Sequence, residues 1–340
     1  MELLFSYLFF LLKVLTVLIA IVVAIVLIAG TAKQKKDTYK GKIIVKNLSE
    51  KLEEISLGLK SSSMDPKSYK QLLKKQNKEK KKETKQKPKD LIYVLDFKGD
   101  IQASGVDKLK QEINAIIASE VKCKEVVLKL ESAGGSAYSY GLCAAELKRL
   151  VDHKIPLTVC IDKLAASGGY LMSCVATKIV AAPWALVGSI GVVAQLPNFN
   201  KFLKKLNIDI ELHTAGRYKR TLTTLGKNTQ SGRQKFVSEL EELHKVFKGF
   251  VKENRPNINV NKVATGEVWQ GDEALKLGLI DDIGTSDDYL VKLSKKFKLI
   301  EIEYFEKKPI TARFATAAEL LLEKGIYKVL DIVNKDRFIT

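Results

Sequence analysis

Short apolar runs alternate with amphipathic stretches along the chain from residue 90 onward. The apolar runs predict strands over residues 92–97, 125–130, 155–161, 178–182, 191–194, 208–212 and 300–304. Helical spacing of apolar residues predicts helices over 105–119, 138–151, 232–253 and 315–333, with short helices and turns over 263–290. Because strands that alternate with helices usually pair in parallel, the pattern predicts a mostly parallel, layered α/β core.

The N-terminal region carries a long apolar stretch, residues 7–29, in which Lys13 is the one charged residue. As a helix this stretch would be about 34 Å long, which is enough to cross a bilayer. It exceeds the apolar region of a typical cleavable signal peptide, although the small residues 29–32 leave cleavage open. We therefore expect residues 1–30 to form an uncleaved transmembrane anchor.

Lysines follow this stretch closely and carry most of the charge of the chain. Residues 33–90 hold 19 lysines and 8 acidic residues, so they supply 11 of the net charge of +18 and leave +7 (18 − 11) for the rest. Residues 43–59 predict a short amphipathic helix, and residues 67–89 are polar enough to predict a solvated linker or loose helix. We expect residues 31–90 to be a juxtamembrane spacer that also contacts anionic lipids. Nucleic-acid binding is not expected, because few aromatic residues interleave with the lysines.

The cysteines and histidines do not form a metal-binding pattern. None of the four cysteines has CxxC spacing, and most of them lie in apolar surroundings that are typical of buried thiols. The three histidines include no HExxH pair, which argues against a zinc hydrolase. We expect no metal and no cofactor.

A hydroxyl surrounded by small residues lies at 164–170, directly after an expected strand. Small neighbours let a substrate backbone approach Ser167 closely, and the start of a helix favours a developing negative charge there. The simpler interpretation is that Ser167 caps the helix and that the glycines make a turn.

A serine nucleophile needs a base, and none of the three histidines lies beside a Gly/Ser turn of the kind found in hydrolases. The chain also has no GxSxG motif. A neutral lysine is the other candidate, since burial favours the uncharged amine. Lys219 follows a glycine turn but is flanked by Arg217 and Arg220, so the sequence alone favours a solvated basic turn over a catalytic base in this stretch. The pair Gly134 and Gly135 follows another strand and could present free N–H groups to an oxyanion, or could simply form a tight turn.

Four motifs occur in a fixed order: Ser-Ala-Gly-Gly at 132–135, Ala-Ala-Ser-Gly-Gly-Tyr at 165–170, Val-Gly-Ser-Ile-Gly-Val at 187–192 and Gly-Arg-Tyr-Lys at 216–219. This order resembles the signal peptide peptidase A family of serine peptidases, and its SohB branch more closely. The resemblance covers about residues 90–295 and the general layout of residues 1–90. It implies the fold shared by ClpP and crotonase, built from repeated ββα units, and assembly into rings or smaller oligomers.

The resemblance also implies roles for individual residues. Ser167 matches the family nucleophile and Lys219 its general base, while Ser189 matches a serine that holds the lysine in place. Gly135 and Gly168 match the oxyanion donors. The family usually has proline at the position before the two glycines, where this chain has alanine, so we expect a more mobile oxyanion turn.

The sequence therefore predicts a membrane-anchored serine endopeptidase that uses a Ser/Lys dyad to hydrolyse signal-peptide-like or misfolded polypeptides. The expected order is a transmembrane anchor (1–30), a lysine-rich segment (31–90), a peptidase domain (91–305) and a C-terminal helical extension (306–340). Its expected partners are peptide substrates, membrane lipids and further copies of the chain. Two alternatives are a crotonase-type enzyme acting on acyl thioesters and a non-catalytic membrane scaffold.

The expected location is the bacterial inner membrane, crossed once. The resemblance implies a catalytic domain on the periplasmic side. The lysines after the span favour the cytoplasmic side instead, by the positive-inside rule.

Overall fold

The computed structural model describes residues 6–7, 9–14, 16–17, 41–83 and 90–306. Residues 43–304 form one compact unit, and the described residues of 1–42 and 305–340 belong to a second one. Within the described residues no helix has the length and apolar character needed to cross a membrane. Most of the predicted span, residues 18–29, lies outside the described residues, as does the predicted helix over 315–333.

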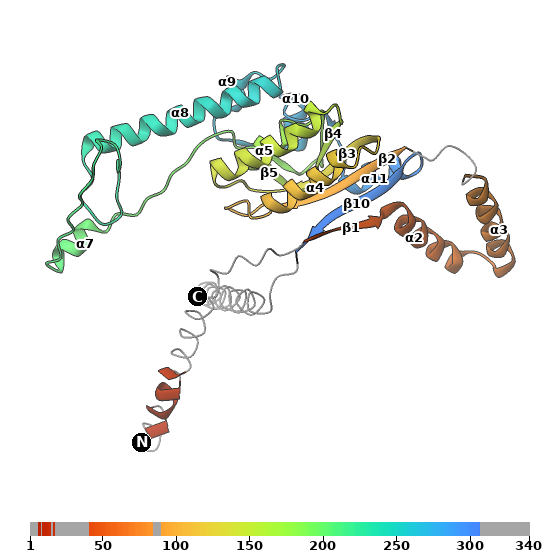
Figure 1. Cartoon of the computed structure of the whole chain (residues 1–340), viewed down its shortest axis with the longest axis horizontal. Helices are drawn as coiled ribbons and strands as arrows, with labels where there is room; N and C mark the ends of the chain where they lie inside the picture. Colours follow the sequence, from red (N-terminus) through yellow and green to blue (C-terminus); the bar gives the residue numbers. More distant parts are fainter. Residues whose placement is uncertain (1–5, 8, 15, 18–40, 84–89, 307–340) are drawn as a thin grey trace, which may run out of the picture. The chain divides into compact units, whose positions relative to one another are not determined.

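A seven-stranded sheet forms the centre of the larger unit (Figure 1). In spatial order its strands are β1 (Lys42–Asn47), β10 (Lys298–Phe305), β2 (Leu91–Lys98), β3 (Cys123–Glu131), β4 (Leu157–Ile161), β6 (Lys178–Ala181) and β9 (Asp282–Ile283). All pairs from β10 to β9 are parallel. A second sheet consists of β5 (Leu164–Ala166), β7 (Leu186–Gly188) and β8 (Val268–Gln270). The α/β class and the mostly parallel core are thus confirmed.

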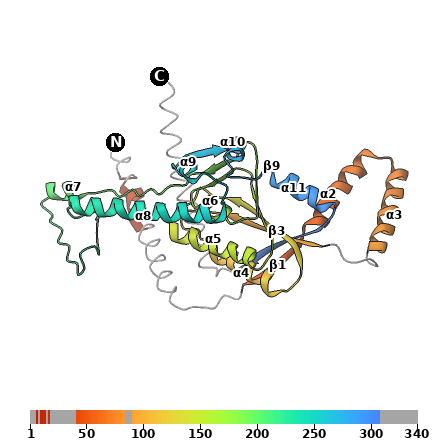
Figure 2. The same ribbon diagram turned by 90° about the horizontal axis from the view of Figure 1, so that it is seen from above.

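Helices connect these strands (Figure 2). They are α2 (Leu48–Ser63), α3 (Pro66–Glu83), α4 (Val106–Ala118), α5 (Ala137–Asp152), α6 (Gly168–Ser173), α7 (Asn200–Lys205), α8 (Gln230–Asn254), α9 (Val260–Val263), α10 (Gly271–Lys276) and α11 (Ser286–Ser294). The predicted helices over 105–119, 138–151 and 232–253 are α4, α5 and α8.

The main sheet is buried on both faces because successive side chains of each strand point to opposite sides. On β2, Tyr93, Leu95 and Phe97 pack into the larger core with α4 and α5. Ile92 and Val94 point the other way, into a smaller core that α2 and α11 cover. This double burial explains why the strands are nearly continuous apolar runs in the sequence.

The lysine-rich segment contributes to this fold, contrary to a purely solvated spacer. Residues 42–47 form an edge strand, where a helix over 43–59 had been predicted, and the helix begins only at Leu48. The Asn47 side chain accepts a hydrogen bond from the Glu50 N–H and so caps this helix. The Ser49 hydroxyl accepts a 2.8 Å hydrogen bond from the Leu299 N–H of β10, which joins the segment to the sheet.

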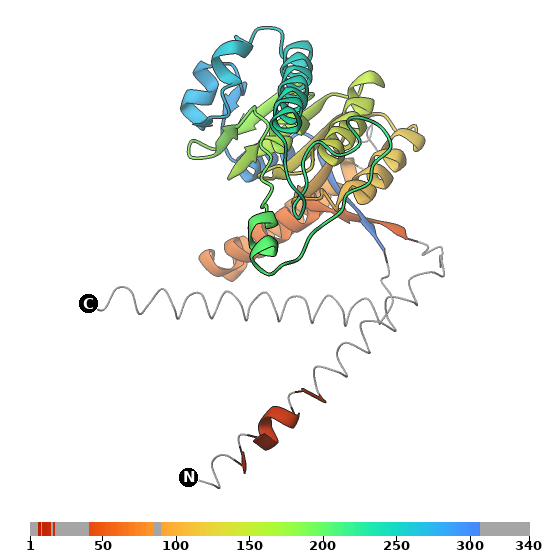
Figure 3. The same cartoon turned by 90° about the vertical axis from the view of Figure 1, so that its left-hand side faces the viewer.

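Two predicted strands, residues 191–194 and 208–212, are wrong. Both stretches lack strand structure and lie in the long excursion between β7 and α8, which leaves the sheets and ends at the start of α8, and α8 then leads back toward the sheets (Figures 1 and 3). The alternating apolar residues of the second stretch are 40–51% exposed: Ile208, Ile210 and Leu212. Alternation alone does not make a strand when no neighbouring strand is available for pairing.

Candidate active site

Ser167 occupies a sharp turn between β5 and the short helix α6. Its backbone angles are φ 52° and ψ −117°, which non-glycine residues rarely adopt and which cost about 1–3 kcal/mol. The neighbouring strand holds this conformation, because the Ser167 N–H donates a 2.8 Å hydrogen bond to the carbonyl oxygen of Gly188. The Ser167 hydroxyl does not cap α6, so the simpler interpretation as a capping residue is wrong. The side chain is partly exposed and available for chemistry.

The glycine turn after β3 lies directly against this serine. Gly134 has φ +86°, and a Cβ atom built on it would lie 2.6 Å from the backbone nitrogen of Gly168 and 2.7 Å from Cβ of Ser167. A side chain at position 134 therefore has no room, and only glycine lets the two turns touch. The structure thus brings the turn at 134–135 together with Ser167 and Gly168.

Backbone N–H groups at this junction have no acceptor among the described residues. The Gly135 N–H makes no hydrogen bond there, and Gly135 is exposed. Gly168 is the first residue of α6, so its N–H has no partner within the helix. Free N–H groups beside a serine hydroxyl can stabilise the negative charge of a tetrahedral intermediate.

Ser189 follows β7, the strand that runs parallel to β5. It also has a positive φ of 51°, and its N–H donates a 2.6 Å hydrogen bond to the carbonyl oxygen of Glu267. The carbonyl oxygen of Gly188 accepts the hydrogen bond from the Ser167 N–H, and Ser189 is the next residue after Gly188. Ser189 therefore lies close to the turn at Ser167. The structure therefore places three of the predicted elements of the site side by side.

Lys219 lies elsewhere in the described structure. It belongs to the segment between α7 and α8, which is at the end of α8 remote from the sheets in Figures 1 and 2. Lys219 is exposed, and among the described residues its amine makes no hydrogen bond or ion pair. The backbone N–H of Lys219 donates a 3.1 Å hydrogen bond to the carbonyl oxygen of Gly216 and closes the turn at residues 216–219. A single copy of the chain, as described here, does not bring this lysine to the serine.

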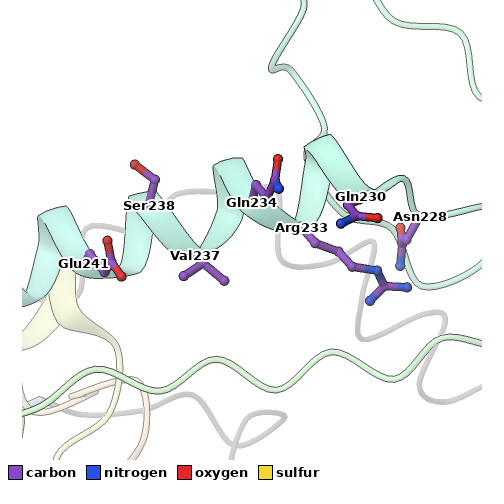
Figure 4. Close-up of a pocket in the computed structure, with 7 residues that line it drawn as sticks. All are labelled: Asn228, Gln230, Arg233, Gln234, Val237, Ser238 and Glu241. Atoms are coloured by element: carbon purple, nitrogen blue, oxygen red, sulfur yellow. The ribbon is translucent and has the colours of Figure 1, made fainter.

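A groove of about 620 Å³ lies along one face of the N-terminal half of α8 (Figure 4). Its lining is polar except for one valine and consists of Asn228, Gln230, Arg233, Gln234, Val237, Ser238 and Glu241. Across the described part of the chain, no three His, Cys, Asp or Glu side chains gather as metal ligands. The expectation that the protein uses no cofactor stays a prediction.

Several residues around the site were not singled out from the sequence. The indole of Trp269 on β8 covers Gly188, and its Nε1 atom is buried without a hydrogen-bond partner in the described structure. The Nε2 atom of His244 on α8 lies 3.3 Å from the carbonyl oxygen of Ile190, next to Ser189. No local motif marks these side chains, because strands and helices distant in sequence bring them to the site.

A strained serine beside free backbone N–H groups is an arrangement that suits enzymes of the acyl-transferring class, in which a serine hydroxyl attacks a carbonyl group. Comparison with known proteins narrows this class. The model of the peptidase family S49 N-terminal region matches residues 2–147, and that of peptidase family S49 matches residues 149–299. "Probable protease SohB" of Haemophilus influenzae is 44% identical over 331 residues, which cover 94% of each chain. The chain therefore belongs to peptidase family S49.

A second relative and a solved structure are also similar to this chain. "Probable protease SohB" of Buchnera aphidicola subsp. Acyrthosiphon pisum is 49% identical over 264 residues, 78% of this chain and 75% of that protein. A solved structure, the 1510-N membrane protease specific for a stomatin homolog from Pyrococcus horikoshii, is 19% identical with a TM-score of 0.33. It covers 60% of this chain and 78% of the other. A likeness at this TM-score supports no inference.

Proposed function

We propose that the protein is a membrane-anchored serine endopeptidase in which Ser167 is the nucleophile. The observation that carries the proposal is the contact between the strained turn at Ser167 and the glycine turn at Gly134, where a Cβ atom would lie 2.6 Å from the Gly168 nitrogen. Strain of this kind persists only where the surrounding structure enforces it, and it concentrates at functional sites. Membership of a peptidase family makes peptide-bond hydrolysis the matching reaction.

In the proposed mechanism the Ser167 hydroxyl attacks the scissile carbonyl while Lys219 accepts its proton. The N–H groups of Gly135 and Gly168 stabilise the oxyanion, and Ser189 orients the lysine amine. Collapse of the intermediate breaks the C–N bond, and the lysine returns the proton to the leaving amine. Water, activated by the same lysine, then hydrolyses the acyl-enzyme and regenerates the serine.

We further propose that the dyad forms between copies of the chain. The position of Lys219 on an exposed segment supports this, because that segment makes no hydrogen bond to residues 164–189 within the described structure. The excursion also exposes large apolar side chains that a second copy could cover: Phe199, Phe202, Leu206, Ile208, Ile210 and Leu212. In such an oligomer, Lys219 of the partner subunit would serve Ser167 of its neighbour.

The proposal includes an anchor at residues 7–29, single-pass location in the bacterial inner membrane and lipid contact by the lysine-rich segment. The apolar length of that stretch and the lysines behind it support these roles. The substrates would be signal-peptide-like or misfolded polypeptides bound in extended form. We also propose kinship with the ClpP and crotonase fold, which the small second sheet beside a parallel sheet supports.

The test is cleavage of casein by the full-length protein in detergent. Ser167→Ala and Lys219→Ala should each lower turnover by several orders of magnitude, whereas Lys227→Ala, an exposed lysine of the same excursion, should not. Mixing the two inactive variants under conditions of subunit exchange should restore activity if the dyad crosses copies. Full activity of Ser167→Ala would refute the proposal.

A further inference from the structure

A buried hydrogen-bonded pair, Ser132 and Tyr140, lies beneath the proposed oxyanion site. Ser132 directly follows β3 and is 2% exposed, and Tyr140 lies in the first turn of α5 and is fully buried. The Ser132 Oγ and Tyr140 hydroxyl oxygens are 2.6 Å apart. The Gly134 N–H donates a 3.0 Å hydrogen bond to Ser132 Oγ, and the Tyr140 hydroxyl donates a 2.8 Å bond to the carbonyl oxygen of Asp100.

The available protons fix the direction of this chain of hydrogen bonds. The Asp100 carbonyl can only accept, so the single phenolic proton of Tyr140 goes to it. The Ser132 hydroxyl must then donate to the Tyr140 oxygen, and it accepts from the Gly134 N–H. The chain runs in one direction from the glycine turn to the loop before α4, and each bond polarises the next.

This chain determines which N–H groups face the serine. Because the Gly134 N–H is turned inward to Ser132, the turn leaves the next N–H, that of Gly135, without an acceptor. On the other side of Gly135, the Ser136 N–H donates a 2.7 Å hydrogen bond to the Ile101 carbonyl. Gly135 therefore carries the one free donor between two anchored ones.

The same pair supports the helix that follows the nucleophile. A Cβ atom on Gly168 would overlap the ring of Tyr140, so the ring lies directly against this glycine. A Cβ atom on Gly169 would lie 2.6 Å from the carbonyl oxygen of Ser132. Gly168 therefore packs against Tyr140 and Gly169 against Ser132, and neither position has room for a side chain.

We propose that Tyr140 and Ser132 are positioning residues that hold both oxyanion donors, Gly135 and Gly168, at a fixed separation. The inference rests on the proposed function, because it concerns how the donors of that site are aligned. Tyr140 touches one donor with its ring and fixes the other through its hydroxyl and Ser132. A donor misplaced by about 1 Å can lose about 100-fold in rate.

The ordinary explanation is that Tyr140 is only a core residue with a satisfied hydroxyl. Tyr289 offers a matched control, since its hydroxyl also hydrogen-bonds within the fold, to Glu125 at 3.2 Å, but on the face covered by α11. Both tyrosines can be changed to phenylalanine, which keeps the ring and removes one hydroxyl. Only the change at position 140 should affect catalysis.

The experiment compares kcat, KM and inhibition by a peptide aldehyde, which forms a tetrahedral adduct with the serine, in the full-length protein. Tyr140→Phe and Ser132→Ala should each lower kcat about 10-fold to 100-fold, less than the complete loss of a donor, with KM changed about 2-fold or less. The aldehyde should bind more weakly by a similar factor. The double variant should be no worse than about the poorer single variant, because both act through one hydrogen-bond chain. Tyr289→Phe should match wild type.

The outcomes separate this inference from the proposed function. If Ser167→Ala is inactive while Tyr140→Phe and Ser132→Ala keep wild-type kcat and aldehyde affinity, the positioning role is wrong and the nucleophile stands. If Ser167→Ala is fully active, the proposed function itself is wrong. Thermal melting monitors folding, and Ser132→Ala decides alone should Tyr140→Phe melt below the assay temperature.

Discussion

Glu112 lies on the buried face of α4, and its replacement by glutamine should stabilise the protein at pH 8 but hardly at pH 5. The side chain is almost fully buried, and one carboxylate oxygen accepts a 2.8 Å hydrogen bond from the Tyr304 N–H. Lys108 is 3.9 Å away and shared with Glu303, so it compensates the charge poorly. Burial, which penalises the ionised form, raises the pKa of Glu112 from 4.5 to about 7.

The sign of the effect follows from the direction of this pKa change. A raised pKa in the folded state means that stability is full below pH 4.5 and is lost as the pH rises through 7. At about 1.4 kcal/mol per pH unit, the difference between 4.5 and 7 corresponds to about 3 kcal/mol at pH 8. Glutamine stays neutral and can still accept from the Tyr304 N–H, so it avoids this loss. At pH 5 the gain should be within about 1 kcal/mol.

Urea unfolding of wild type and Glu112→Gln between pH 5 and pH 8 measures the difference. Asp282→Asn is the control, because its hydrogen bond with Lys178 lowers the pKa of Asp282 and Asp282 lies apart from Glu112 and Lys108. A lowered pKa in the folded state means that the carboxylate stabilises the fold at pH values above the ordinary pKa of a carboxyl group. This stabilisation is lost as the pH falls. The control Asp282→Asn should therefore lower stability at pH 8, by less than about 1 kcal/mol, since the pair with Lys178 is partly exposed. A free-energy difference for Glu112→Gln that stays constant from pH 5 to pH 8 would refute the reasoning.

Two further predictions concern the glycine turn and a partly buried ion pair. Gly134→Ala should lower turnover 100-fold or more, because φ of Gly134 is +86° and the new Cβ would lie 2.6 Å from the Gly168 nitrogen. Gly141→Ala is the control, because a Cβ atom at this position of α5 meets no other atom within 4 Å. This variant should keep activity and raise the free energy of unfolding by about 0.5–1 kcal/mol. Arg255→Leu should lower the free energy of unfolding by about 2–3 kcal/mol, because it leaves Asp281, now bonded at 2.7 Å, without its cation. The exposed pair of Lys163 is the control, and Lys163→Leu should cost less than about 0.5 kcal/mol in urea unfolding.

The parts of the fold that the sequence predicted well are those in which the local spacing of apolar residues indicates the structure. The strands at 92–97 and 125–130 were recognisable because they are buried on both faces, and α8 because its apolar face repeats at helical spacing. The strand at residues 42–47 could not be recognised, because it pairs with β10, which lies about 250 residues away in sequence. The hydrogen bond from the Leu299 N–H to the Ser49 hydroxyl joins the adjoining helix α2 to the same strand. The three-residue strands β5, β7 and β8 are too short to have a pattern of their own.

The candidate site also has features that the sequence shows directly and features that depend on contacts formed only in the folded chain. The glycines and Ser167 were visible as motifs, since their types report a tight turn. The strain at Ser167 was not visible, because it depends on a hydrogen bond to Gly188 from another strand. The link between Ser132 and Tyr140 was also missed, although the two residues are only eight positions apart. A serine and a tyrosine at that spacing have no meaning until the strand-to-helix turn between them brings their hydroxyls together.

The two halves of the proposed site differ in how the fold supports them, and this difference has a consequence for mutations. The serine and the oxyanion turn follow β5 and β3, and a β-bridge between Ser132 and Ala165 joins these strands directly before the turns. Substitutions in this half should therefore change stability and activity together. Lys219 follows no strand and lies on an exposed segment that makes few contacts with the core. Substitutions around it should leave the stability of one copy unchanged and act on assembly and turnover, which is the pattern expected if a second copy completes the site.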